Sequence, residues 1–311
     1  MTSSFHWKPI IALVALLASV SACHKEKPRP RTPSKPPERP LCAISTRSTN
    51  ADISLAPATW FTLLLPGYRL DSGEVSRPVV DCAGRPVRWR SAAVECADLE
   101  QDLAYRPSQP LLPEDLVLTK LPDGRRLVWV KTDYLVDGQA EGPLAITEFT
   151  SQELVVRALG TLRAPATRPR FSVVGMATQN VVVVEGDACP DGEKGDCWRG
   201  MRLLPIGDRT FSAEPIRRPD GACVEGALFN LSRVEDVSRP HGRRRLTMAA
   251  TVDVGKDGIN IHEDVSVREL ENGRPGKLLR QAQTERVIRL VGRRMVTTEP
   301  SLLARLLADT P

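Results

Sequence analysis

Two runs of alternating apolar and polar residues near the end of the chain limit its fold more than any other feature. The apolar positions are Leu246, Met248, Ala250, Val252 and Val254 in the first run, and Ile259, Ile261, Val265 and Val267 in the second. Successive side chains of a β-strand point to opposite faces, so this period of two indicates strands with one buried face. The sequence GKDG between the runs can form a tight turn. Residues 246–267 are therefore predicted to form a β-hairpin.

Turn signals and further apolar runs extend this pattern over much of the chain. Six dipeptides can supply the positive φ that tight hairpin turns require, namely Asp123-Gly124, Asp137-Gly138, Asp191-Gly192, Asp220-Gly221, Asp257-Gly258 and Asn272-Gly273. Runs rich in β-forming residues are found at 126–130, 144–149, 154–159, 171–176, 181–185, 201–206 and 286–291. Residues 181–184 are four consecutive valines without alternation, which predicts a central strand covered on both faces.

Helical patterns are rare in this sequence. Pro300 precedes SLLARLLA, in which four leucines form an apolar stripe, so a short C-terminal helix is predicted. Residues 92–103 are a second helical candidate. Many short strands with little helix predict a mainly β fold, as a single large all-β domain. No repeated blade pattern is present, so propeller-like and sandwich-like arrangements both remain open.

The first 22 residues have the layout of a signal peptide. A short polar start ends at Lys8, an apolar run follows at residues 10–17, and small residues precede Cys23. The apolar stretch ends at Val20 and is too short to span a bilayer, which needs about 20 apolar residues. Residues 1–22 are therefore predicted to be a cleaved export signal.

The tetrapeptide Val20-Ser21-Ala22-Cys23 resembles the lipobox of bacterial lipoproteins, where a branched apolar residue and two small ones precede an obligatory cysteine. The resemblance implies transfer of diacylglycerol to the Cys23 thiol, cleavage before Cys23 and acylation of the new amino terminus. Two or three acyl chains would anchor the protein to a membrane that it does not span. In the Gram-negative families an Asp after the cysteine usually signals inner-membrane retention, so His24 implies the outer membrane. Both the periplasmic and the surface face of that membrane remain open.

Residues 24–40, HKEKPRPRTPSKPPERP, are predicted to form a stiff tether. Their six prolines and eight charged residues cannot bury apolar surface and favour polyproline II, which at about 3.1 Å per residue gives a reach of roughly 50 Å. Together with the lipidated Cys23, this tether occupies residues 23–40 between the signal peptide and a domain at residues 41–311.

The domain at residues 41–311 carries no net charge. The chain has 43 basic and 38 acidic residues, and removing Lys8 and the charged residues of the tether leaves 36 of each. Nucleic-acid binding needs a net basic face, so no nucleic-acid partner is expected.

Six cysteines remain besides Cys23, and in an exported chain they predict three disulfides. Three lie before residue 100 and three after residue 188, so complete pairing requires at least one bridge between the two groups. The preferred set joins Cys189 to Cys197, Cys82 to Cys96 and Cys42 to Cys223.

No motif of a known catalytic site is present. The sequence lacks a GxSxG elbow, an HExxH helix, a P-loop and a GxGxxG turn. Its cysteines also lack the CxxC spacing that zinc favours. No catalytic residue, metal or cofactor is therefore predicted.

Two features are candidate ligand contacts. Arg243, Arg244 and Arg245 form a basic cluster that starts in a proline-containing loop, a pattern more typical of a solvated hairpin end. His262 occupies a polar-face position of its strand, where alternation places Asp264 on the same face. The intervening Glu263 is predicted to lie on the opposite face.

These features predict a lipoprotein held by its anchor on the membrane, whose β-rich domain binds another envelope component, a protein or a glycan, without catalysis. An envelope hydrolase that cleaves peptidoglycan or polysaccharide with carboxylates is an alternative, and an acidic cleft with two carboxylates about 5 to 10 Å apart would favour it. A purely structural lipoprotein subunit is a third.

Overall fold

The computed structural model describes residues 39–45, 55–93, 95–96, 103–177, 179–192, 196–239 and 242–308. The predicted signal peptide, Cys23 and the predicted tether as far as residue 38 lie outside the described residues. Residues 40–311 form one compact unit. None of its described helices is long and apolar enough to cross a membrane.

Two β-sheets make up most of this unit, and 56% of the described residues are in strands or bridges and 8% in helices. The small sheet has six strands in the order β1-β6-β5-β3-β2, with β4 beside β5. The bounds are β1 Cys42–Ser45, β2 Leu116–Lys120, β3 Arg126–Val130, β4 Asp133–Tyr134, β5 Gln139–Phe149 and β6 Glu153–Pro165. The predicted mainly β fold is confirmed, and the sheets form no closed barrel.

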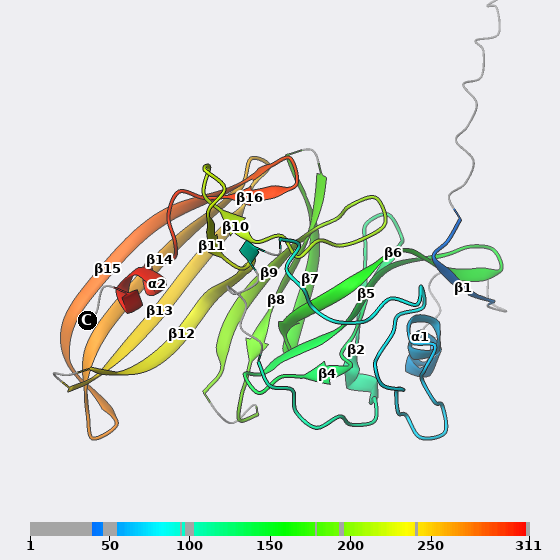
Figure 1. Cartoon of the computed structure of the whole chain (residues 1–311), viewed down its shortest axis with the longest axis horizontal. Coiled ribbons are helices and arrows are strands. Elements are labelled where there is room, and N and C mark those ends of the chain that lie inside the picture. Colours follow the sequence, from blue (N-terminus) through cyan, green and yellow to red (C-terminus); the bar gives the residue numbers. More distant parts are fainter. Residues whose placement is uncertain are drawn as a thin grey trace, which may run out of the picture. The chain divides into compact units, whose positions relative to one another are not determined.

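The large sheet has ten strands in the order β11-β10-β16-β15-β14-β13-β12-β9-β8-β7. Their bounds are β7 Thr167–Met176, β8 Gln179–Ala188, β9 Trp198–Pro205, β10 Ile216–Arg217, β11 Cys223–Glu225, β12 Leu228–Arg239, β13 Gly242–Val254, β14 Ile259–Glu271, β15 Arg274–Val291 and β16 Arg294–Val296. The four long strands from β12 to β15 are visibly curved (Figure 1).

The predicted hairpin is confirmed. Strands β13 and β14 pair antiparallel from Arg244 opposite Glu269 to Val254 opposite Ile259, and the GKDG sequence lies in the turn between them. The glycines of all six predicted turn dipeptides have positive φ. Position 258 also requires a residue without a side chain, because a Cβ there would lie 2.4 Å from the carbonyl oxygen of Ile288.

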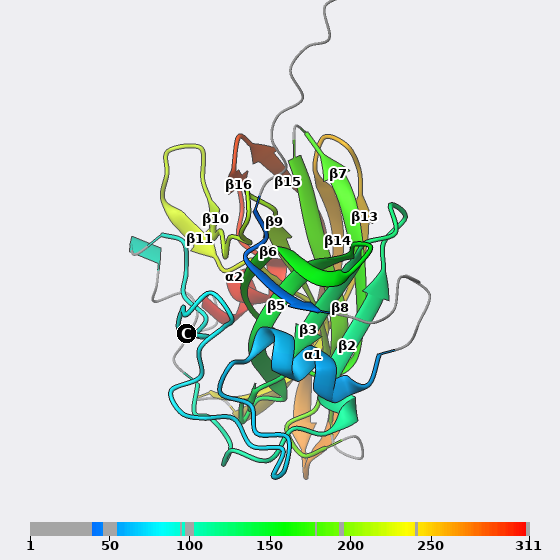
Figure 2. The same cartoon turned by 90° about the vertical axis from the view of Figure 1, so that its right-hand side faces the viewer.

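One hydrophobic core lies between the two sheets. Trp129 of β3 and Leu144 of β5 pack there with Val182 and Val184 of β8. The opposite face of the small sheet is covered by helix α1, Pro57–Leu64, whose Trp60 belongs to a second core (Figure 2). Two sheets with a shared core are a sandwich-like arrangement.

A third core shows that the large sheet curls around its own apolar face. Val181 and Val183 of β8 pack in it with Ile261 of β14 and Ile288 of β15, which are distant strands of the same sheet. Because their neighbours Val182 and Val184 face the core between the sheets, the predicted burial of this strand on both faces is confirmed.

The predicted C-terminal helix is confirmed as α2, Leu302–Ala308. Its leucines pack on Leu246 and Met248 of β13 and on Val265 of β14. Helix α1 was not predicted, because its eight residues show no clear apolar stripe in the sequence. The second helical candidate at residues 92–103 falls largely outside the described residues.

A buried charge network joins α2 to the large sheet. Glu263 of β14 accepts hydrogen bonds from the Arg286 Nε at 2.9 Å and from the Leu302 backbone N–H at 2.6 Å. Arg286 also pairs with Glu225 of β11. The side chain of Glu263 is fully buried, whereas His262 is exposed, so the predicted separation of these neighbours onto opposite faces is confirmed.

Three disulfides are present among the described residues, and two of the preferred pairings were wrong. The bridges are Cys42–Cys82, Cys96–Cys223 and Cys189–Cys197. The pairings Cys82 with Cys96 and Cys42 with Cys223 were wrong because Cys42 on β1 lies beside the loop of Cys82, while Cys96 lies beside β11. The expected bridge between the two halves is Cys96–Cys223, which spans 127 residues.

Candidate ligand-binding groove

Residues 82–96 form an irregular segment that is fixed at both ends. Cys82 is bonded to β1 of the small sheet, and Cys96 is bonded to β11 of the large sheet. Between them Val87 and Trp89 are buried, whereas Arg88 and Arg90 are exposed. The alternation of an extended backbone thus directs two arginines to solvent from a segment whose other face is in the core.

Trp89 anchors this segment to both sheets. Its backbone N–H donates a 2.9 Å hydrogen bond to Oε1 of Glu141 on β5. Its ring lies 4.1 Å from the guanidinium carbon of Arg202 on β9, and Arg202 is 1% exposed. A cation over an indole ring at this distance is attractive, more so when it is desolvated. The arginine-bearing segment is therefore held in a defined position.

Glu141 is a buried carboxylate that supports an exposed aromatic ring. It is 2% exposed, and its second oxygen accepts a 3.2 Å hydrogen bond from the hydroxyl of Tyr105. Burial raises the pKa of Glu141, against the opposing effects of the Trp89 N–H and Arg163. Tyr105 itself is 44% exposed, so its ring is presented to solvent while its hydroxyl is tied down.

A hollow of about 350 Å³ lies over this carboxylate and ring, and we call it the central hollow. Arg77, Arg88 and Arg106 contribute to its lining, together with Tyr105 and Glu141. Arg106 donates to the carbonyl of Pro190, which belongs to the loop closed by the Cys189–Cys197 disulfide. Arg88, on the segment between Cys82 and Cys96, and Arg106, bonded to the loop of Cys189 and Cys197, therefore line the same hollow.

Asp133 also lines the central hollow, and it has two polar contacts. Arg77 forms an ion pair with it, and the hydroxyl of Thr132 donates a 2.9 Å hydrogen bond to it. Asp133 of β4 pairs directly with Glu141 of β5, so both carboxylates project on the same side of the strands. Arg77 is accordingly neutralised within the protein.

Two smaller hollows adjoin the central one. The lysine hollow, of about 210 Å³, shares Arg106, Ser108 and Asp133 with the central hollow and is also lined by Lys131. The tryptophan hollow, of about 190 Å³, shares Arg88 with the central hollow and is also lined by Arg90. We call the three together the loop groove, because irregular segments supply much of its lining.

The lysine hollow contains a tightly packed polar set. Lys131 is 7% exposed, donates to the carbonyl of Ala166 at 3.3 Å and lies over the ring of Tyr134. Burial lowers the pKa of Lys131, and Asp115 opposes this effect. The hydroxyl of Tyr134 donates to Asp115, and burial together with this bond raises the pKa of Tyr134. These buried and half-buried side chains form the floor of the lysine hollow.

The charges on the rim of the loop groove are not balanced locally. Within the part of the chain that the structure describes, Arg88, Arg90 and Arg106 form no salt bridge with a carboxylate. The domain at residues 41–311 is neutral as a whole, so these three arginines form a local positive strip, beside the exposed carboxylate of Glu114 in the lysine hollow.

A hollow outside the loop groove, of about 540 Å³, lies on strands β13, β14 and β15, and its lining includes His262. His262 stands 3.8 Å from Glu285, and the amides of Gln281 and Gln283 bind Asp264 at 3.3 and 2.7 Å. No group of three or more potential metal ligands occurs in the described part of the chain. A ligand role for His262 stays a prediction.

The predicted basic cluster lies at a hairpin end. Arg243, Arg244 and Arg245 begin β13, and Arg245 binds Asp236 of β12 through two hydrogen bonds of 2.7 and 2.8 Å. In the register of the two strands, Arg245 of β13 lies opposite Arg268 of β14. Arg268 is six positions from His262, a distance of about 20 Å along a strand. The structure thus does not bring the basic cluster and His262 together.

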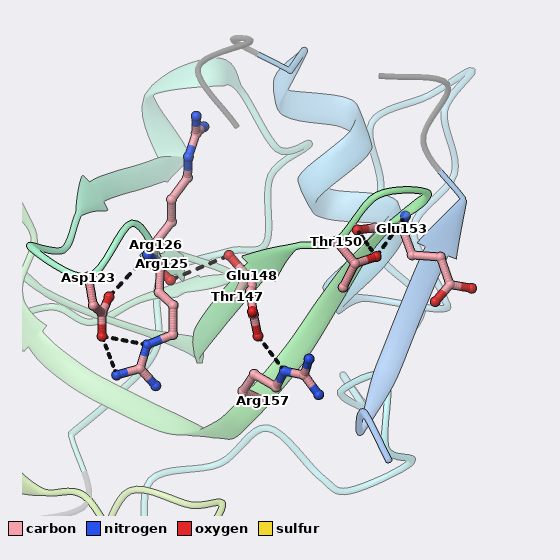
Figure 3. A network of polar contacts seen from close by, with 8 residues as sticks. All are labelled: Asp123, Arg125, Arg126, Thr147, Glu148, Thr150, Glu153 and Arg157. Atoms are coloured by element: carbon pink, nitrogen blue, oxygen red, sulfur yellow. Dashed lines mark hydrogen bonds and ion pairs between the residues drawn. The ribbon is translucent and has the colours of Figure 1, made fainter. Parts of the chain in front are cut away.

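A polar network on the small sheet contains two ion pairs. Figure 3 shows Arg157 of β6 pointing to Glu148 of β5, with 2.7 Å between Nε and Oε2, and Arg125 pointing to Asp123 across a turn. The side chains of Arg157 and Glu148 remain 30% and 42% exposed, so the pair is solvated. Such surface pairs contribute little to stability and leave no charge for a ligand.

Comparison of this chain with protein-family models, with curated proteins and with solved structures finds no match. Its function must be argued from its own residues.

The residues of the loop groove were missed in the sequence. The only signal was the alternation in RPVRWR at residues 85–90, where Val87 and Trp89 alternate with Arg88 and Arg90. It is too short to distinguish a half-buried segment from a loop. Glu141 and Tyr105 carry no local pattern at all, because they meet only through folding.

Proposed function

We propose that this protein is a lipid-anchored envelope protein without catalytic activity, whose β-rich domain binds another envelope component along the loop groove. The groove carries the proposal because three arginines without a carboxylate partner line adjoining hollows, two of them on a segment that disulfides hold at both ends and the third bonded to the Pro190 carbonyl. A backbone that is already held in place loses little conformational entropy on binding, which favours a recognition site. The lipobox and the tether supply the anchor in this proposal.

A photo-crosslinking experiment tests the groove as the binding site. A photo-reactive amino acid would replace Ser108, which lines both the central and the lysine hollows. The matched control carries the same group at Thr247, an exposed position of β13. Irradiation of intact cells is expected to attach an envelope component at position 108 only. Equal adducts at both positions, or none at 108, would overturn the proposal.

The anchor is tested separately. Metabolic labelling with a fatty-acid analogue should mark the wild-type protein and fail to mark Cys23→Ala. Labelling that persists in this variant would refute lipidation at Cys23, whatever the groove binds.

One observation favours an envelope hydrolase as a second candidate function. Glu141 and Asp133 face the same hollow from paired positions of β5 and β4. Two carboxylates on one face of neighbouring strands are the kind of pair that glycosidases use. A raised pKa such as that of Glu141 suits a general acid.

Incubation of purified domain with peptidoglycan and with envelope polysaccharide distinguishes the two functions. The binding proposal expects no reducing ends to be released by wild type or by Glu141→Gln. If wild type releases reducing ends and Glu141→Gln does not, the binding proposal is wrong and hydrolysis takes its place.

A further inference from the structure

We infer that the loop groove binds a glycan chain that carries oxyanion groups, carboxylate or phosphate, and that Arg88, Arg90 and Arg106 hold these groups. This inference deepens the proposed function and depends on it. The step beyond it is the chemical class of the ligand.

The guanidinium groups supply the argument from charge. Arginine presents donors in a planar fork that matches a carboxylate or a phosphate, and such charge-assisted bonds are stronger than neutral ones. Arg88 makes no hydrogen bond among the described residues, and the hydrogen bond of Arg106 to the Pro190 carbonyl leaves its charge uncompensated. An anionic ligand would supply the missing charge without displacing an internal partner.

The placement of the arginines suits an extended ligand. Arg88 and Arg90 are two residues apart on an extended segment, which separates their Cα atoms by about 7 Å. Arg106 reaches the central hollow from a different segment. The three adjoining hollows share Arg88 or Arg106 as boundary residues. A chain with repeated anionic groups can therefore contact the arginines in succession.

The lining favours a glycan over a protein surface. Protein interfaces have apolar cores and bury about 800 Å² on each partner. Of the large apolar side chains on the loop groove, only Tyr105 and Leu112 are markedly exposed, at 44% and 49%. The ring of Tyr105 offers a face for a sugar ring, and Ser108 and Asp133 offer partners for hydroxyl groups.

Direct binding to defined probes tests the inference with the purified domain. The carboxylate probe is oligogalacturonate, its neutral control is the methyl ester of the same oligomer, and the phosphate probe is a sugar-phosphate oligomer. Calorimetry should show binding of at least one anionic probe and none of the ester. The affinity should fall as ionic strength rises from about 0.05 to 0.5 M, because salt screens exposed charges.

Two triple variants with equal changes in charge make the test specific. Arg88→Gln with Arg90→Gln and Arg106→Gln should weaken binding by about tenfold for each arginine. The control changes Arg274, Arg280 and Arg289 of β15 to Gln, three exposed arginines away from the groove, and should bind as wild type does.

The outcomes separate the two proposals. Binding of only one anionic probe identifies the carboxylate or the phosphate source and supports the inference. Equal weakening in both triple variants, or binding of the ester, overturns it. Crosslinking at position 108 without binding of any anionic probe overturns the ligand class but leaves the groove as the site. Absence of crosslinking overturns the proposed function itself.

Discussion

Glu141 does two things for the molecule at the scale of a single residue. It accepts the Trp89 backbone N–H and thereby fixes the arginine-bearing segment, and it holds the Tyr105 hydroxyl. A carboxylate at 2% exposure loses most of its hydration, and burial raises its pKa. The residue is therefore a structural support of the groove whose charge is costly to the folded state.

This cost predicts a pH dependence of stability. The pKa of Glu141 is higher in the folded than in the unfolded state, so unfolding releases a proton as the pH rises between the two values. Its favourable contribution is present below the unfolded pKa and is lost as pH rises through the folded pKa. Glu141→Gln should therefore gain stability relative to wild type as the pH rises above about 4, the unfolded pKa of a glutamate, measured by urea unfolding.

The control for this prediction is Glu153→Gln, which removes a carboxylate at an exposed position of β6. Its stability should follow that of wild type over the same pH range. Parallel curves for wild type and Glu141→Gln would show that burial does not shift this carboxyl group.

At the scale of elements, helix α2 depends on one carboxylate of the large sheet. Glu263 binds Arg286 and the Leu302 N–H, so it connects β14, β15 and the first turn of the helix. The leucines of α2 also cover the apolar face of β13 and β14. The C-terminal helix and the long strands should therefore unfold together.

Glu263→Ala should destabilise the domain by about 3 kcal/mol or more, because Arg286 stays buried after losing one of its two carboxylate partners. Urea unfolding measures the loss, and hydrogen exchange of residues 302–308 should accelerate. Glu285→Ala removes an exposed carboxylate of β15 and should change stability by no more than about 0.5 kcal/mol. Equal effects of the two variants would contradict this role of Glu263.

Elements with a regular period were predictable from the sequence, and irregular ones were not. The 246–267 hairpin and the C-terminal helix are predicted by apolar residues that recur with periods of two and of about 3.6, and such periods are local properties of the sequence. Helix α1 has only eight residues, and most of its apolar side chains are buried in one core. The described residues 82–93 lie in no helix or strand, so their position depends on disulfides and on Trp89.

At the scale of the whole molecule, the disulfides connect what the sheets leave separate. Parity among the six cysteines predicted a long-range bridge but not its members, because spacing along the chain contains no information about which loops meet in space. The neutral charge of the domain likewise concealed the positive strip of the groove. The number of cysteines and the net charge therefore constrain the fold but do not locate the loop groove.

The three bridges should differ in their effect on stability. By the chain-entropy argument, Cys96–Cys223 closes a loop of 127 residues and contributes about 5 kcal/mol, whereas Cys189–Cys197 closes one of 8 and contributes about 2.5 kcal/mol. Paired Cys→Ser variants, unfolded by urea under non-reducing conditions, measure both. Equal losses, or the reverse order, would contradict this ranking.

The fixation of residues 82–96 at both ends also sets the time at which the groove exists. Cys42 and Cys82 can join early in synthesis, but Cys96 must wait for Cys223, which leaves the ribosome 127 residues later. Before that bond forms, the segment that carries Arg88 and Arg90 is bonded at Cys82 but not at Cys96. The full fixation of the segment thus requires the chain as far as Cys223 and a compartment in which thiols are oxidised.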